Sequence, residues 1–358
     1  MQVVNYRLSR ALQGARHAGL RILRGVPSEG VVADPQTAVW LPDLVTLLYP
    51  DVEEKESLIK QSREVLGKDS VTTSSELRHL LANFDRQAFP SPVSVRFRPE
   101  DIRTLRLKDF SIALDRHDPS VSAIIADRLE YEPHVAAIMR RYVKPGMTVL
   151  DIGANIGFHA MLFSSLVGPS GRVIAFEPNS ENCRLILATA DGNHVTNIEL
   201  RPVALDTDTG WTYFTSHLGS NGGILRKGSV QYVEGGGFIV PCFPLDKLVD
   251  SPVDFIKIDV EGAEGRVIAG GLETISRYRP VVISEFSVEM LKRVSELDAI
   301  EYLTWFAELD YSLNIVESDE PSRLMPFSSP QELLASWGSD ELRVADLLFL
   351  PKKDGSSA

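Results

Sequence analysis

The chain has 358 residues, 44% of them hydrophobic and 24% charged, which is typical of a globular protein. Its formal net charge of −12 opposes a nucleic-acid partner, because binding to a phosphate backbone needs clustered lysine and arginine to displace counterions. No apolar run approaches the roughly 18 residues that a transmembrane helix requires. The two cysteines, Cys183 and Cys242, have no partner at metal-ligand or disulfide-framework spacing, so we predict a cytoplasmic protein.

The N-terminal part of the chain predicts helices that match no known motif. Five arginines and no acid precede Glu29, but this segment lacks the continuous apolar core of a signal peptide. A basic amphipathic helix could contact an anionic membrane surface, although packing on its own protein is the simpler interpretation. Residues 36–87 read as helices joined by polar turns, and the Pro-Ser-Pro segment at 90–92 interrupts them. We predict a helical extension over residues 1–92 of unknown role, and a homo-oligomer stays open.

From residue 93 the sequence changes to short β-rich runs that alternate with helical segments. This pattern is typical of a sheet covered by helices on both faces. The expected strands lie at 149–152, 173–176, 198–203, 255–258 and 281–286, with a terminal antiparallel pair at 311–316 and 344–350. The expected helices lie at 156–166, 180–190, 263–276 and 288–308. We predict one domain over residues 93–353, followed by a disordered tail at 354–358.

A glycine-rich insertion at 210–244 separates the third and fourth of these strands. Loops at the carboxyl edge of such a sheet usually shape the substrate site. A surface hairpin is an equally good interpretation of the same residues.

The strongest signal is the segment at 148–157, a buried strand that ends in an acid and a glycine turn opening a helix. Gly153 and Gly157 permit tight turning, and the helix N-terminus offers N–H groups to a carboxylate. Asp151 can then hold an ammonium group. A dinucleotide would need a second glycine where Asn155 stands, to approach its pyrophosphate. The segment therefore favours S-adenosylmethionine, which has no pyrophosphate.

Two further strand ends carry acids that suit an adenosine ligand. Glu177, after the second strand, can accept hydrogen bonds from both ribose hydroxyls, although an acid at a helix N-terminus is also stabilised by the helix dipole. Asp206, after the third strand, could accept a hydrogen bond from the adenine amino group. Turn acids are common, so Asp206 is the weaker candidate.

Acids also gather after the fourth and fifth strands, where open α/β sheets hold their ligands. Asp259, Glu261 and Glu264 follow the fourth strand, and Glu285 ends the fifth. One of them could act as a general base, or the set could bind a divalent cation. Because no histidine-rich set accompanies them, the sequence assigns no metal. The alternative bases are His159 and His217, although a lone histidine is more often an ordinary one.

The segments Asp-Ile-Gly-Ala-Asn-Ile-Gly, Phe-Glu-Pro-Asn and Ile-Lys-Ile-Asp-Val-Glu-Gly-Ala-Glu, in this order, resemble the FkbM family of methyltransferases. Tyr-Glu-Pro at 131–133 and the segment at 279–285 also resemble family features. The resemblance covers about 95–285 and implies an α/β class I methyltransferase fold, a Rossmann-like, mostly parallel sheet with helices on both faces. The residues expected to contact S-adenosylmethionine are Glu132, Asp151, Gly153, Ala154, Asn155, Gly157, Glu177, Pro178, Ala204, Asp206 and Asp259. The catalytic candidates are Asp259, Glu261, Glu285 and His217.

Members of this family methylate hydroxyls, often on sugars or natural products. The resemblance therefore implies an O-methyltransferase that acts on a sugar, a glycan or a polyketide-like small molecule. The alternatives are N- or C-methylation of a small molecule, and a cofactor-binding scaffold with little catalysis. The acids at Asp259, Glu261 and Glu285 favour an enzyme, because a scaffold needs no such cluster.

Overall fold

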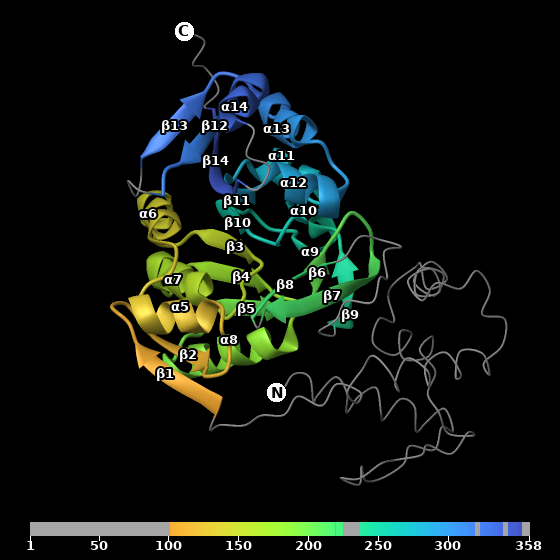
Figure 1. Cartoon of the computed structure of the whole chain (residues 1–358). Coiled ribbons are helices and arrows are strands. Elements are labelled where there is room, and N and C mark those ends of the chain that lie inside the picture. The colour runs from red at the N-terminus through yellow and green to blue at the C-terminus, as the bar shows by residue number, and fades with distance from the viewer. Residues whose placement is uncertain (1–100, 219, 225–236, 319–322, 339–342, 353–358) are drawn as a thin grey trace, which may run out of the picture. The chain divides into compact units, whose positions relative to one another are not determined.

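The computed structural model describes residues 101–218, 220–224, 237–318, 323–338 and 343–352 (Figure 1). The expected N-terminal extension at 1–92, its boundary with the next domain and the tail at 354–358 lie outside these residues. Among the helices that are described, none is long and apolar enough to cross a membrane.

An eight-stranded sheet forms the centre of the domain, in the order β13-β12-β14-β11-β10-β3-β4-β5. The parallel strands are β3 (Thr148–Ile152), β4 (Arg172–Phe176), β5 (Ile198–Arg201), β10 (Phe255–Ile258) and β11 (Val281–Phe286). The antiparallel strands are β12 (Tyr311–Val316), β13 (Leu324–Phe327) and β14 (Ala345–Pro351). The predicted strands and terminal pair are thus present, and β13 is an additional edge strand.

Helices cover both faces of this sheet, as Figure 1 shows. They are α5 (Val121–Arg128), α6 (Pro133–Tyr142), α7 (Phe158–Val167), α8 (Ser180–Gly192), α9 (Leu245–Leu248), α10 (Glu264–Ala269), α11 (Leu272–Tyr278), α12 (Val288–Met290), a π-helix (Leu291–Ser295), α13 (Ala299–Glu308) and α14 (Pro330–Trp337). Successive residues of a strand point to opposite faces. Val149 accordingly belongs to one hydrophobic cluster and Leu150 to the other. This two-faced burial confirms the predicted fold class.

Two helices predicted as continuous are interrupted. The segment predicted at 263–276 breaks at Gly270. A Cβ atom there would overlap the backbone oxygen of Asp206, because the two segments of the chain approach too closely for a larger residue. The segment predicted at 288–308 breaks at Glu296, whose φ of 55° is left-handed and ends the π-helix. Helical periodicity does not report such contacts, since they depend on neighbours distant in sequence.

The glycine-rich insertion folds into a second, four-stranded sheet in the order β6-β9-β7-β8. Its strands are β6 (Ala204–Leu205), β7 (Gly210–Leu218), β8 (Asn221–Ile224) and β9 (Gly237–Phe243). A separate pair, β1 (Ile102–Arg106) and β2 (Ser111–Asp115), packs on α8, where Ala113 N–H donates to Thr189 Oγ1 at 2.9 Å. Strand β8 leads directly to the candidate site.

Candidate functional site

A cavity opens at the carboxyl ends of the parallel strands. The space within it, including the solvent at its open mouth, is about 980 Å³. The predicted site residues that line it are Glu132, Gly153, Ala154, Asn155, Glu177, Pro178, Ala204, Asp259, Glu261 and Glu285. The sequence therefore predicted about a third of the lining residues, including the five carboxylates among them.

The glycine loop between β3 and α7 forms the floor of this cavity. Gly153 has a φ of 79°, and a Cβ there would overlap the backbone oxygen of Asp259. Gly157 has a φ of 91°, and its Cβ would lie 2.9 Å from Ile186 Cγ1 on α8. Both positions therefore require glycine. Gly157 turns the chain into α7 and does not line the cavity wall, so its expected contact with the cofactor stays a prediction.

Glu177 is almost fully buried at the end of β4. Its Oε2 accepts a hydrogen bond of 2.8 Å from Asn155 N–H, and its Oε1 accepts one of 2.8 Å from Asn179 N–H. Burial raises the pKa of Glu177 to about 8, although these N–H groups lower it. Each carboxylate oxygen keeps a further lone pair, so the group can still accept two hydroxyl donors from the cavity.

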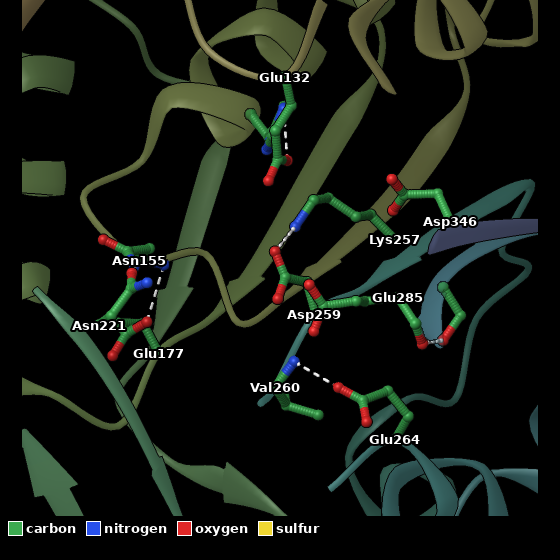
Figure 2. A network of polar contacts seen from close by, with 12 residues as sticks. Glu132, Asn155, Glu177, Asn221, Lys257, Asp259, Val260, Glu264, Glu285 and Asp346 are labelled. Atoms are coloured by element: carbon green, nitrogen blue, oxygen red, sulfur yellow. Dashed lines mark hydrogen bonds and ion pairs between the residues drawn. The ribbon is translucent and has the colours of Figure 1, made fainter. Parts of the chain in front are cut away.

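The loop that contains Asn155 is hydrogen-bonded to the insertion (Figure 2). Asn155 Nδ2 donates to Asn221 Oδ1 at 3.0 Å. The preceding residue of the insertion is held as well, because Ser220 O accepts from Asn182 Nδ2 at 2.9 Å and Ser220 N–H donates to Asp118 Oδ1 at 3.0 Å. A glycine at position 155 would lack the amide that makes the first of these bonds. The insertion is therefore a wall of the site as well as a hairpin.

Lys257 is a site residue that sequence reasoning missed. It lies in the otherwise apolar strand β10, is 4% exposed and lines the cavity. Its Nζ lies 3.0 Å from Asp259 Oδ2. Burial alone would lower the pKa of this ammonium, but the carboxylates of Asp259, Asp151 and Glu132 raise it. A charged residue in the middle of a predicted buried strand was the signal that could have revealed it.

Besides Gly157, two expected cofactor contacts lie away from the cavity wall. Asp151 is fully buried and is the register partner of Lys257 on the neighbouring strand, and burial raises its pKa to about 6. Asp206 is also fully buried, and its Oδ1 accepts a 2.9 Å hydrogen bond from Arg266 Nε. Asp206 is thus ion-paired with Arg266, whereas both carboxylate oxygens of Asp151 are buried without a hydrogen-bond partner among the described residues. The expected contacts of these two acids with adenine and with an ammonium stay predictions.

The acids beyond β10 and β11 divide into two groups. Asp259, Glu261 and Glu285 line the cavity. Glu264 does not, because its Oε1 accepts hydrogen bonds from Val260 N–H at 2.9 Å and Gly262 N–H at 3.2 Å (Figure 2). Glu264 therefore holds the loop, and the other three acids lie in the cavity wall.

Glu132 reaches the cavity from the start of α6, opposite these acids in Figure 2. Its φ of 44° is left-handed, and burial together with Asp259 raises its pKa to about 8. His159 Nε2 lies 3.7 Å from Glu132 Oε2, and burial lowers the pKa of this imidazole well below its usual range. The side chain of His217 lies outside the described residues. Within the described ranges no group of three or more potential ligands could hold a metal ion.

Residues 151–313 match the family model of the methyltransferase FkbM domain. They form an FkbM methyltransferase domain. The match begins at Asp151 in β3 and extends to Leu313 in β12, so the FkbM domain includes the glycine loop, the insertion and the acids beyond β10 and β11. This finding confirms the family to which the sequence motifs pointed.

Curated relatives match over part of the chain. The chain is similar to 2-O-methyltransferase NoeI of Sinorhizobium fredii, with 30% identity over 41% of this chain and 66% of that protein. It is also similar to a protein-L-isoaspartate O-methyltransferase of Methanopyrus kandleri, with 31% identity over 35% of this chain and 50% of that protein. The chain thus spans only part of the length of these relatives. A crystal structure of methyltransferase FkbM from Methylobacillus flagellatus KT aligns with a TM-score of 0.36 and 17% identity, over 63% of this chain and 57% of that one.

The residues of the cavity fit S-adenosylmethionine, the cofactor of this class of methyltransferase. The glycine loop leads into the N-terminus of α7, and the buried carboxylate of Glu177 faces the cavity beside it. The ligand carries a sulfonium and an ammonium, and the excess of carboxylates over cations in the cavity wall complements these charges.

Proposed function

We propose that this protein transfers a methyl group from S-adenosylmethionine to a hydroxyl of an uncharged acceptor, such as a sugar, a glycan or a polyketide-like natural product. This proposal rests on the charge of the part of the cavity wall that would face the acceptor. Asp259, Glu261 and Glu285 line the cavity together. Lys257, the one ammonium among the described lining residues, already forms an ion pair with Asp259.

This charge distribution favours a hydroxyl over a carboxylate as the methylated group. An anionic acceptor would lie among like charges in a partly buried site, where charge repulsion is stronger than in water. NoeI is named as a 2-O-methyltransferase, whereas the isoaspartate relatives are named for an acidic residue. The acid-lined wall therefore supports the first kind of acceptor.

The cofactor would be held by residues of the first half of the domain. In this proposal Glu177 accepts the ribose hydroxyls and Glu132 faces the ammonium, which is supported by the position of both residues in the cavity wall. S-adenosylmethionine supplies a methyl group activated by the sulfonium. The protein contributes alignment, because holding the acceptor oxygen in line with the methyl carbon removes much of the entropic barrier.

The acceptor proton is the remaining chemical problem. A sugar hydroxyl is a weak acid, so a positioned base that accepts the proton during attack contributes roughly 10²- to 10⁴-fold. The acids beyond β10 and β11 would supply that base.

Methyl transfer from labelled S-adenosylmethionine to a matched acceptor set tests the proposal. The set consists of a neutral glycoside, the glycoside bearing a carboxylate, and the glycoside bearing an amine. We expect transfer to a hydroxyl of the neutral compound, with kcat/KM at least about tenfold lower when a carboxylate adjoins that hydroxyl. Methylation of the carboxylate or the amine, with none at a hydroxyl, would contradict the proposal.

A further inference from the structure

The loop that follows β10 carries three carboxylates with different contacts. Asp259 Oδ2 is bound to Lys257 Nζ at 3.0 Å. Glu264 Oε1 is held by two backbone N–H groups. The carboxylate of Glu261 forms no hydrogen bond or ion pair with any residue that the structure describes, although it lines the cavity. Glu261 is therefore the carboxylate of this loop that remains available to a ligand.

The backbone at Glu261 is in a conformation that glutamate rarely adopts. Its φ is 54°, and the next residue, Gly262, has a φ of 96°. A left-handed conformation at a residue other than glycine costs on the order of 1 kcal/mol and persists only where the surrounding structure enforces it. Here the bonds to Glu264 and a 2.7 Å hydrogen bond from Ser295 Oγ to Gly262 O hold the loop. Strain of this kind is concentrated at functional sites, where it directs a side chain.

Glu261 also lies where the catalytic loop meets the insertion. A Cβ built on Gly223 of β8 would lie 3.2 Å from Glu261 Cβ. The insertion is joined to the glycine loop by the bond between Asn155 and Asn221. Glu261 is thus placed between the segment expected to hold the cofactor and the segment expected to shape the acceptor site.

We propose that Glu261 is the general base that removes the proton from the acceptor hydroxyl, and that Asp259, held by Lys257, positions the acceptor. This inference rests on the proposed function. As the acceptor oxygen forms its bond to the methyl carbon, the carbon–sulfur bond breaks with its electron pair on sulfur. The hydroxyl proton passes to a carboxylate oxygen of Glu261 and then to solvent at the mouth of the cavity.

The electrostatic surroundings agree with this assignment. Burial, and then repulsion from Asp259, raise the pKa of Glu261 to about 7, which suits a base that works near neutral pH. The charged and titratable groups that face it are Lys257 from β10, Asp259 just beyond that strand, Glu285 from β11 and Tyr131 ahead of α6. Burial and the neighbouring carboxylates of Asp259, Glu264 and Glu261 also raise the pKa of Glu285 well above its usual range.

The test compares Glu261→Gln with Glu273→Gln, a matched change at an exposed carboxylate on α11. We expect Glu261→Gln to lower kcat by about 10²-fold or more while the cofactor Kd from calorimetry stays within about threefold. Glu273→Gln should keep parental values. Added formate should restore part of the activity of Glu261→Ala, because a small anion can occupy the place of the missing carboxylate.

Two further measurements separate a base from a structural residue. The acidic limb of the kcat/KM profile near pH 7 should be present in the parent and absent in Glu261→Gln. Carbon-13 NMR of labelled glutamate carboxyls should show a resonance that titrates near pH 7 and is missing in that variant. This second readout needs no acceptor, so it distinguishes failure of this assignment from failure of the proposed function. A folded Glu261→Gln variant with near-parental kcat, or the absence of such a resonance, would overturn the assignment.

Discussion

His134 on α6 and Asp346 on β14 are joined by a hydrogen bond of 2.7 Å, although they lie 212 positions apart in the sequence. Asp346 is also the register partner of Glu285 on β11. His134 lies in the first turn of α6, two residues after its N-cap Glu132. Glu132 lines the cavity from the side opposite Glu285. This single pair therefore connects the wall that carries Glu132 to the wall that carries Glu285.

Replacing Asp346 by Asn should weaken this connection in a pH-dependent way. The hydrogen bond to Asp346 raises the pKa of His134, so its stabilising contribution is complete below the unfolded pKa and is lost as pH rises through the folded pKa. We expect Asp346→Asn to lower the free energy of unfolding by about 1 kcal/mol at about pH 6 and by less at about pH 9. Denaturant unfolding of this variant, His134→Gln and the double variant would measure it. Additive losses would show that the two residues are not coupled.

Replacing Glu177 by Gln should weaken cofactor binding and change its proton balance. The carboxylate accepts hydrogen bonds from two ribose hydroxyls more strongly than a neutral amide does. Losing its charge should therefore cost on the order of 1 to 3 kcal/mol of cofactor-binding free energy. Because burial holds the pKa of free Glu177 at about 8, ribose donors that favour the ionised form should release protons on binding at neutral pH. Calorimetry in two buffers of different ionisation enthalpy would detect this release in the parent and a smaller one in Glu177→Gln. Equal proton release in both proteins would refute the role of Glu177.

Replacing Lys257 by Met should destabilise the domain most at alkaline pH. The change leaves Asp151 and Asp259 without their buried cation, which costs about 3 to 5 kcal/mol when such a pair is broken. Burial raises the pKa of Asp151, and a carboxyl with a raised folded pKa favours folding while it is protonated, so the loss should shrink as pH falls. Unfolding curves at about pH 5 and about pH 8.5 would show the trend. The Asp151→Asn change combined with Lys257→Met should recover part of the stability, and a pH-independent loss would contradict this account.

Replacing Gly153 by Ala should damage the fold more than the same change at Gly168. Both residues have positive φ, 79° and 65°, so both variants lose the freedom that glycine provides. The Cβ at Gly153 would overlap Asp259, whereas nothing lies within 4 Å of the Cβ at Gly168. Gly168 has a ψ of −173°, a backbone region that is nearly restricted to glycine, so we expect a loss of about 1 to 3 kcal/mol for Gly168→Ala and a clearly larger one for Gly153→Ala. Thermal unfolding would compare them, and equal losses would exclude the close contact with β10.

Replacing Asn155 by Gly should weaken acceptor binding more than it lowers the stability of the fold. Glycine tolerates the observed φ of 50° at least as well as asparagine, so the stability should change little. The hydrogen bond to Asn221 would be lost, which frees the insertion from the glycine loop. We expect the KM for the acceptor to rise by about threefold or more while the cofactor Kd changes less. An unchanged acceptor KM would mean that this bond does not order the acceptor site.

The sequence by itself determined the parallel core, the glycine loop and Glu177 at the next strand end. These features are encoded within a few consecutive residues, as buried apolar runs and as glycines whose φ no other residue adopts readily. The same local signals placed Glu261 and Glu285 at strand ends, because parallel strands deliver their carboxyl ends to one edge of the sheet.

Only the tertiary structure decided what each charged group faces. Asp206 is paired with Arg266, Asp151 faces Lys257, and His134 reaches Asp346 across most of the domain. A buried charge is stable only where a partner or a hydrogen bond compensates it, and that partner can come from any part of the chain. The sequence therefore predicted which acids lie at the edge of the sheet, and the packing decided which of them remain free to act.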